Sequence, residues 1–198
     1  MMKKVWMFLC MLCFALCASV TSYAAGESAV TMAWVNPNAV SDVSAAEQKL
    51  NEGLQGALKN YHFKYGDSAE AQMMMQQYMI ENGIVPDDNK TSVGYLPKKD
   101  DMRAFAKELG VQYVVFTNAR ITDEKAKLAW FSLAGAKYEV TVLFTTIVYK
   151  ADEDRYVYFN QQSVKENAAG TSSTERAFNK CCATYFAKKL TPDTFVLK

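Results

Sequence analysis

Residues 138–150, YEVTVLFTTIVYK, are the stretch that decides the fold. β-Branched and aromatic residues dominate this stretch, and neither proline nor glycine interrupts it, which is typical of a strand. Alternate residues form two faces, and both faces are mostly apolar or threonine. A strand that is apolar on both faces requires a covering layer on each. The stretch therefore predicts a long central strand in a sheet that helices or another layer cover.

Working outward from this strand, hydrophobic periodicity predicts the remaining elements. Period-two patterns predict strands at 29–35, 61–65, 111–121 and 155–165, and a further short strand at 194–197 is left open. Apolar residues at helical spacing predict helices at 44–60, 67–82, 100–110 and 172–190. Two Ser-x-x-Glu capping boxes, Ser44 with Glu47 and Ser172 with Glu175, mark the starts of the first and last helices.

The order of the predicted elements is strand, helix, strand, helix, helix, strand, strand, strand, helix. Early alternation of strands and helices favours parallel pairing, while the later run of strands with short connections favours antiparallel pairing. A chain of 198 residues is long enough for one domain with a sizeable core. We therefore predict a single α/β (α+β) domain over residues 25–198, with one mixed sheet of about five strands packed with about four helices.

The beginning of the chain has the pattern of a secretory signal peptide over residues 1–24. Lys3 and Lys4 give a basic start of bacterial type, residues 5–18 are apolar without a charge, and small residues precede a cut after Ala24. The apolar run is too short for a membrane span of ~20 residues. No later stretch is long and apolar enough to cross a bilayer as a helix. We predict an exported protein, periplasmic or secreted, without a transmembrane helix after removal of the signal.

The cysteines of the signal segment do not form a lipobox. A bacterial lipoprotein signal needs a small residue immediately before the acylated cysteine, and Cys17 follows the bulky Leu16. Cys10 and Cys13 fit the pattern no better. Plain cleavage of the signal is therefore expected, and lipid anchoring is not.

Charge and motif content argue against several classes of function. The chain has 22 basic and 21 acidic residues, whereas a nucleic-acid-binding protein would need a basic stripe. The sequence has no glycine-rich phosphate loop, dinucleotide fingerprint or Gly-x-Ser-x-Gly elbow. Acidic pairs such as Asp87 and Asp88 lie where turns favour acids, and they lack EF-hand spacing. We therefore predict no nucleic-acid partner, no metal site and no cofactor.

His62 is the sole histidine, so any Ser-His-Asp or Cys-His catalytic arrangement would have to use it. It lies in a short aromatic stretch beside Tyr61 and Phe63, and we favour a non-catalytic role. An exported hydrolase-type enzyme that uses His62 is kept as an alternative. Its mark would be a concave pocket that places this imidazole beside a carboxylate or hydroxyl.

Cys181 and Cys182 are the cysteines that remain after removal of the signal. We predict that they lie on the buried side of the last helix as small apolar residues. An intermolecular or redox-responsive thiol is the alternative, whereas a disulfide between these neighbours would break the helix. They are the candidate redox residues.

Trp130 and Phe131 are the candidate binding residues. They lie in the connection 122–137, where a pair of aromatic side chains either forms an exposed patch for a partner or folds onto the core.

The passage at residues 108–117, ELGVQYVVFT, resembles a Leu-Gly-small-x-Tyr-Val stretch of certain bacterial envelope domains. These include the N-terminal domain of TolB and the curli secretion subunit CsgG. The order and spacing of the elements over 29–190 are similar as well. Thr117 stands where glycine is usual in that set, and the lipoprotein cysteine common there is missing. The resemblance implies a periplasmic α/β domain that binds other envelope proteins and has no catalytic residues to carry over.

These observations favour a non-catalytic binding or assembly module for other envelope proteins, with a homo-oligomer as one form of assembly. Sheet edges and exposed loops would form its contacts. A pore-forming or secretion assembly subunit is a further alternative. It ranks below the first because the strands carry threonine and tyrosine on both faces, without a lipid-facing apolar alternation.

Overall fold

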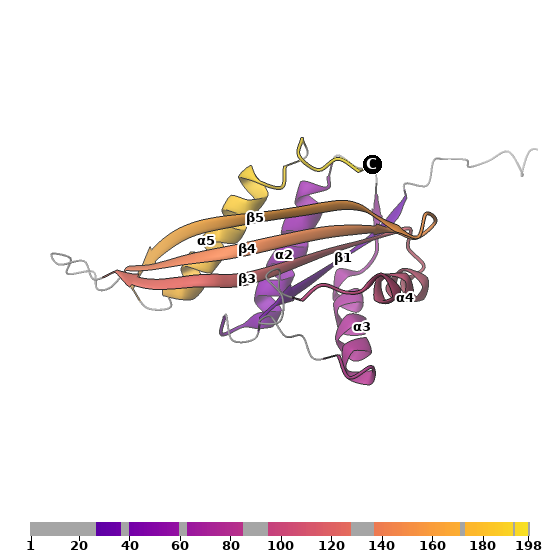
Figure 1. Ribbon diagram of the computed structural model, residues 1–198, viewed down its shortest axis with the longest axis horizontal. Coiled ribbons are helices and arrows are strands. Elements are labelled where there is room, and N and C mark those ends of the chain that lie inside the picture. Colours follow the sequence, from indigo (N-terminus) through magenta and orange to yellow (C-terminus); the bar gives the residue numbers. More distant parts are fainter. Residues whose placement is uncertain are drawn as a thin grey trace, which may run out of the picture.

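The computed structural model describes residues 27–36, 40–59, 63–84, 95–127, 137–170, 173–191 and 193–197. These residues hold five strands and four helices in the predicted order (Figure 1). The elements are β1 (Ser28–Val35), α2 (Val43–Ala57), β2 (Lys64–Tyr65), α3 (Ser68–Glu81), α4 (Lys99–Leu109), β3 (Tyr113–Lys127), β4 (Lys137–Lys150), β5 (Arg155–Ala169) and α5 (Ser173–Lys188).

The strands form one mixed sheet in the order β2-β1-β3-β4-β5. β1 runs parallel to β2 and β3, because helices return the chain between them. β3, β4 and β5 pair antiparallel as a meander, since short connections permit only that pairing. The predicted fold class, with parallel pairing early and antiparallel pairing late, is confirmed.

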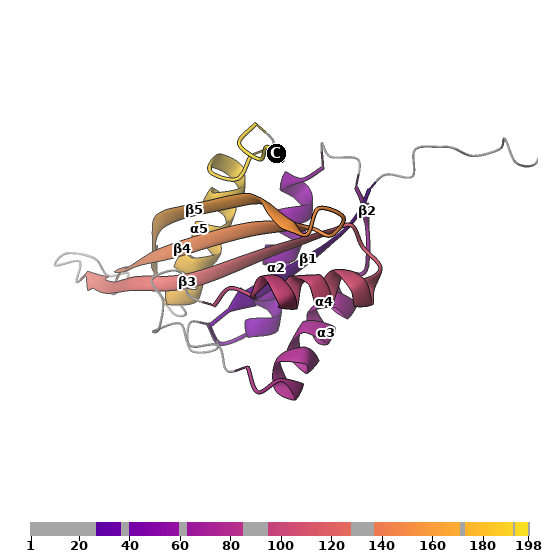
Figure 2. The same ribbon diagram turned by 45° about the vertical axis from the view of Figure 1, so that its right-hand side comes forward.

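One face of the sheet packs against α2 and α5 (Figures 1 and 2). Leu50 and Leu54 of α2 and Phe178 of α5 are fully buried there. Phe144 of β4 stacks on Tyr185 of α5, with ring centroids 4.3 Å apart and planes 8° from parallel. Burial of such rings supplies much of the apolar stabilisation of a core.

The other face packs against α3 and α4. Met75 of α3 and Phe105 of α4 are buried against Met32, Phe116 and Tyr149 of the sheet. This second layer covers β1 and the end of the sheet near the β4–β5 turn, and the strands β3 to β5 run on past it (Figure 1). The central strand is therefore covered on both faces over only part of its length.

The predicted ends of several elements are wrong. β3 continues to Lys127 and β5 to Ala169, because pairing with the long β4 extends both strands into polar sequence. The open question of a strand at 194–197 is also answered. Residues 193–197 form no strand, and Phe195 is instead buried against Tyr158, with ring centroids 4.4 Å apart.

The predicted capping box of the first helix is wrong as well. Asp42 caps α2, because its Oδ1 accepts a hydrogen bond of 2.9 Å from the N–H of Ala45. Glu47, which the capping box would use, is buried instead, and its carboxylate accepts hydrogen bonds from the backbone of Val35 and the side chain of Gln72. Glu47 therefore belongs to the interior between α2, β1 and α3.

Candidate functional site

Cys181 and Cys182 lie on α5, and both are free and buried. The Sγ of Cys181 is 3.5 Å from the carbonyl oxygen of Val164 in the sheet. Burial raises the pKa of the Cys181 thiol to about 11 and that of Cys182 to about 12. Because the thiolate is the reactive form, both groups are held in their unreactive state. Both cysteines are therefore placed as packing residues of the core. Their redox role stays a prediction that this geometry does not support.

Trp130, Phe131 and His62 lie outside the described residues. The contact role of the two aromatic residues and the hydrolase alternative built on His62 therefore stay predictions. Strands β3 and β4 end at Lys127 and Lys137, on either side of the segment that holds Trp130 and Phe131.

The candidate binding surface is the outward face of β5. Alternate residues of this strand, such as Val164 and Ala168, pack into the core on the α5 side. The residues between them point to the other face and are exposed. We call this set the β5 surface, and it consists of Phe159, Gln161, Ser163, Lys165 and Asn167.

Phe159 is the apolar centre of the β5 surface. Its side chain is 60% exposed, which is unusual for a phenylalanine on a strand. Polar partners on β4 hold the neighbouring side chains in place. Lys165 pairs with Glu139 at 3.0 Å, and Gln161 donates to Thr145 at 3.4 Å. The β5 surface thus consists of polar side chains around the exposed ring of Phe159, and contacts with β4 hold two of these side chains in place.

β5 is also the outer strand of the sheet, because no described strand pairs with its free edge. Edge strands present unpaired N–H and C=O groups that can accept another strand. At the end of β5, side chains of α5 use two of these carbonyls. Arg176 donates to Ala169 at 2.9 Å, and Lys180 donates to Asn167 at 2.9 Å. The middle of β5 has no such cover among the described residues.

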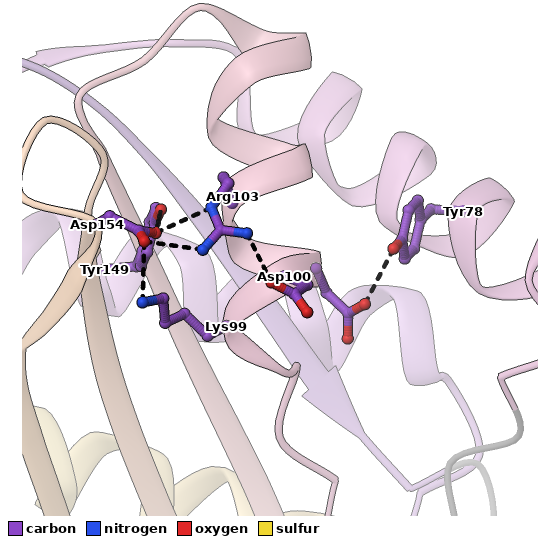
Figure 3. A network of polar contacts seen from close by, with 7 residues as sticks. Tyr78, Lys99, Asp100, Arg103, Tyr149 and Asp154 are labelled. Atoms are coloured by element: carbon purple, nitrogen blue, oxygen red, sulfur yellow. Dashed lines mark hydrogen bonds and ion pairs between the residues drawn. The ribbon is translucent and has the colours of Figure 1, made fainter.

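The opposite end of β5 is fixed by a network of polar contacts with α4 (Figure 3). Asp154, in the β4–β5 turn, accepts two hydrogen bonds from Arg103 at 2.9 and 2.8 Å. It also accepts one from the Tyr149 hydroxyl at 2.7 Å and pairs with Lys99 at 2.9 Å. Arg103 further contacts Asp100 at 2.6 Å. The turn, and with it the start of β5, is therefore held against the helix.

Hydrogen bonds from Arg103, Tyr149 and Lys99 hold the pKa of Asp154 well below its usual range. Such a carboxylate contributes stability that is present above its ordinary pKa and is lost as the pH falls toward the lowered value. We expect Asp154→Asn to unfold at lower urea concentration than the wild type near pH 7. The difference should shrink as the pH falls below the ordinary pKa of aspartate, because the unfolded wild type then binds a proton that the folded protein does not.

Asparagine is the informative replacement at position 154, where the backbone is left-handed with φ at 47°, because it tolerates this conformation. Asp152→Asn is the matched control, since this more exposed carboxylate in the same turn has only a 3.7 Å contact with Lys150. If both variants behave alike in urea, the network does not hold the turn.

The described residues contain no group of three His, Cys, Asp or Glu side chains that could hold a metal ion. In the same part of the chain, no helix is long and apolar enough to cross a membrane.

Comparisons with known proteins concern the fold. No family model and no curated protein matches the sequence. Among solved structures, the chain is similar to the LpoB C-terminal domain from Escherichia coli, with 16% identity, 73% of this chain and 87% of that chain covered, and a TM-score of 0.37. It is similar to lipoprotein GNA1162 from Neisseria meningitidis, with 9% identity, 82% and 96% coverage and a TM-score of 0.42.

A third similar structure is a putative neuraminyllactose-binding hemagglutinin homolog from Helicobacter pylori, with 10% identity, 85% and 88% coverage and a TM-score of 0.45. None of these three is TolB or CsgG. The expectation that the chain lacks a lipid anchor gains no support from them, and the residues on which it rests lie outside the described part. All three similar structures are of bacterial proteins, and one of these proteins is named a lipoprotein.

Proposed function

We propose that this chain is an exported, non-catalytic binding or assembly module of the bacterial envelope, which contacts another envelope protein through β5. The observation that carries the proposal is the position of β5. It is a 15-residue edge strand whose outward face holds an exposed phenylalanine. Away from the β4–β5 turn, no described helix lies over that face (Figure 1). A partner segment can add to such an edge by main-chain hydrogen bonds and gain specificity from the side chains of the face.

The rigid mounting of β5 supports this proposal. Core packing on α5, the side chains of Arg176 and Lys180 at one end, and the Asp154 network at the other fix the strand. A preordered strand loses little conformational entropy when a partner binds. The sequence likeness to the TolB and CsgG set points to the same kind of role. The signal peptide that the sequence predicts over residues 1–24 would put the proposed contact in the periplasm or outside the cell.

The secretion or pore-forming alternative receives less support from the outward face of β5. Gln161, Ser163, Lys165 and Asn167 make this face polar around Phe159. Charged and amide side chains are costly against lipid, so a protein partner suits the surface better than a bilayer does.

The test is photo-crosslinking in the bacterium that makes the protein. A crosslinking amino acid at positions 159, 161 and 163 should trap one partner of defined mass. The same amino acid at position 80 should not, because Ile80 is 80% exposed but lies on α3, away from β5. Position 130 is a further probe, for the predicted role of Trp130.

A product with twice the mass of the chain would assign the β5 surface to a homo-oligomer, which is one form of the proposed assembly. Equal trapping from position 80 and from the three β5 positions would contradict the proposal, and so would an absence of products from β5.

A further inference from the structure

A polar cleft of about 580 Å³ lies between α2 and α3, away from the β5 surface. Its lining residues come from α2, from α3 and from residues 65–67 before α3, and two of them, Gln55 and Gln72, bond to β1. β2 pairs with β1 only at Ser28 and Ala29, so the structure describes no strand beside the rest of this edge of β1. Helix residues at i, i+4 and i+8 of α2, namely Glu47, Asn51 and Gln55, line one side of the cleft. Such spacing places three side chains in one row.

The Gln72 side chain of α3 takes the place of a strand beside β1. Its Oε1 accepts a hydrogen bond from the N–H of Ala33 at 3.0 Å, and its Nε2 donates to the carbonyl of the same residue at 2.7 Å. The second Nε2 hydrogen goes to the carboxylate of Glu47 at 3.0 Å. This arrangement fixes the orientation of the amide and leaves it no free donor.

The side-chain amide of Gln55 also donates both of its hydrogens to other groups of the protein. Gln55 donates to the hydroxyl of Ser68 at 2.6 Å and to that of Thr31 at 3.2 Å. The amide N–H donors of Gln55 and Gln72 therefore all bond to other groups of the protein, and none is available to a ligand.

Two oxygen atoms of residues that line the cleft, in contrast, have no hydrogen-bond partner among the described residues. Asn51 is only 5% exposed, and its Oδ1 has no hydrogen-bond partner among the described residues. The buried hydroxyl of Tyr65, a residue that also lines the cleft, has none either. A buried polar atom without a partner costs free energy. A bound group that donates hydrogen bonds would remove this cost.

The charge of the cleft points to the same kind of ligand. Three carboxylates line it, those of Glu47, Glu52 and Asp67, and no lysine, arginine or histidine is among the described lining residues. Glu47 is 2% exposed, so solvent screens it little. The wall that a cation would meet in the cleft holds a buried carboxylate and buried oxygen acceptors without partners among the described residues. Hydrogen bonds from a cation to such groups are charge-assisted and strong.

We propose that the cleft between α2 and α3 binds the ammonium end of an alkylamine through Glu47 and Asn51. The volume lies within the range of small-ligand pockets. Two sources share this chemistry, a free di- or polyamine and a lysine side chain of a protein. The site is independent of the proposed role of β5, because the two surfaces have no residue in common.

The test is titration of the purified protein with two amine probes, 1,5-diaminopentane and an acetylated, amidated Ala-Lys-Ala peptide. Binding is followed by calorimetry and by the side-chain amide NMR signals of Asn51, Gln55 and Gln72. We expect saturable binding of at least one probe, and no comparable binding of the neutral 1,5-pentanediol. Glu47→Gln and Asn51→Leu should each weaken the affinity about tenfold or more, as expected for loss of a hydrogen bond to a charged group.

Glu108→Gln is the matched control for the loss of one negative charge. Glu108 lies on the exposed side of α4, outside the cleft, so its variant should bind as the wild type does. Each variant is checked for a wild-type backbone spectrum. A variant that fails this check is replaced by Asn51→Ala, which removes the same acceptor with a smaller side chain.

The carboxylate form of Glu47 is the binding form, and burial raises the pKa of this group to about 7. The affinity for the amine should therefore also rise between about pH 6 and about pH 8. The other titratable groups that face the cleft are Glu52 of α2, Asp67 before α3 and Tyr65 of β2. Burial raises the pKa of Tyr65 to about 12, so it stays neutral in this range.

The outcomes separate the two sources and the rival explanation. Binding of the diamine alone assigns a small-molecule ligand, and binding of the peptide alone assigns a lysine of a partner protein. Absence of saturable binding by both probes would overturn the proposal, leaving a water-filled structural cleft. Equal affinity for the diol, or undiminished affinity in Glu47→Gln, would overturn it as well.

Discussion

Replacement of Glu47 by glutamine should stabilise the protein, relative to the wild type, by about 3 kcal/mol more at about pH 8 than at about pH 4.5. The carboxyl of Glu47 is buried between α2, β1 and α3. Burial raises its pKa from 4.5 to about 7, although hydrogen bonds from Val35 and Gln72 oppose the rise. Ionisation of this group therefore costs folding free energy at neutral pH.

The sign follows from the two protonation states. Below about pH 4.5 both the folded and the unfolded chain carry the proton, so Glu47 has no effect on the pH dependence. Between about pH 4.5 and about pH 7 the unfolded chain has lost the proton and the folded chain keeps it, so stability falls as the pH rises. One pKa unit corresponds to about 1.4 kcal/mol, and the shift from 4.5 to about 7 gives the stated difference. Glutamine does not titrate.

The decisive quantity is how the free energy of unfolding changes with pH, and not its absolute value. Both oxygens of Glu47 accept hydrogen bonds, from the N–H of Val35 and from the Nε2 of Gln72, so the amide nitrogen of glutamine at position 47 would face one of these two donors. That clash shifts the stability of the variant at every pH by the same amount. Urea unfolding of wild type and Glu47→Gln across this pH range measures the slope. Glu108→Gln, with its exposed side chain, should show no change of slope. Parallel curves for wild type and Glu47→Gln would show that Glu47 titrates normally.

A carboxyl that lowers stability at neutral pH is typical of functional positions, since binding sites often retain groups that destabilise the fold. The cost of ionised Glu47 would be offset when a cation binds, because ligand binding to the folded state alone stabilises it. The stability prediction and the amine proposal can thus fail separately. A normal pKa would refute the first, and absent amine binding would refute the second.

The sequence predicted the fold well because its strongest patterns are those of packed elements. The two apolar faces of residues 138–150 required cover, and the structure covers them with α2 and α5 on one side and α3 and α4 on part of the other. The end of β3 was missed because its last residues are mostly polar, and that of β5 because Glu166 to Ala169 carry no β-branched or aromatic residue, so pairing with β4 decides both ends.

The cleft was missed for a different reason. From the sequence alone, a row of Glu47, Asn51 and Gln55 on a helix indicates a face in contact with solvent. The neighbouring sequence does not show that β1 has an open edge beside this row. The predicted Ser44 capping box assigned Glu47 to the helix start, whereas α2 begins earlier and Asp42 caps it by accepting from the N–H of Ala45. The spacing of three uncharged or acidic polar residues one turn apart was the available signal, and it became meaningful only with the strand order.

Phe144→Ala should lower the free energy of unfolding by about 3–5 kcal/mol, the usual cost of removing a buried phenylalanine. Phe144 is 0% exposed and stacks on Tyr185. The Tyr185 hydroxyl contacts that of Thr146 at 2.8 Å, and Thr146 contacts Thr117 at 2.6 Å. Loss of the Phe144 ring would leave a cavity beside this chain of buried hydroxyls, which constrains how far α5 can relax into it.

Phe159→Ala is the matched control, because Phe159 lies on the neighbouring strand but is 60% exposed on the opposite face. Urea unfolding should give little change for this variant, while crosslinking to a partner through β5 should be lost. Phe144→Ala should do the reverse wherever it remains folded. If Phe159→Ala destabilised the isolated protein as strongly as Phe144→Ala, the ring would be part of the core. The outward face of β5 would then not be a free binding surface, and the proposed contact would have to lie elsewhere.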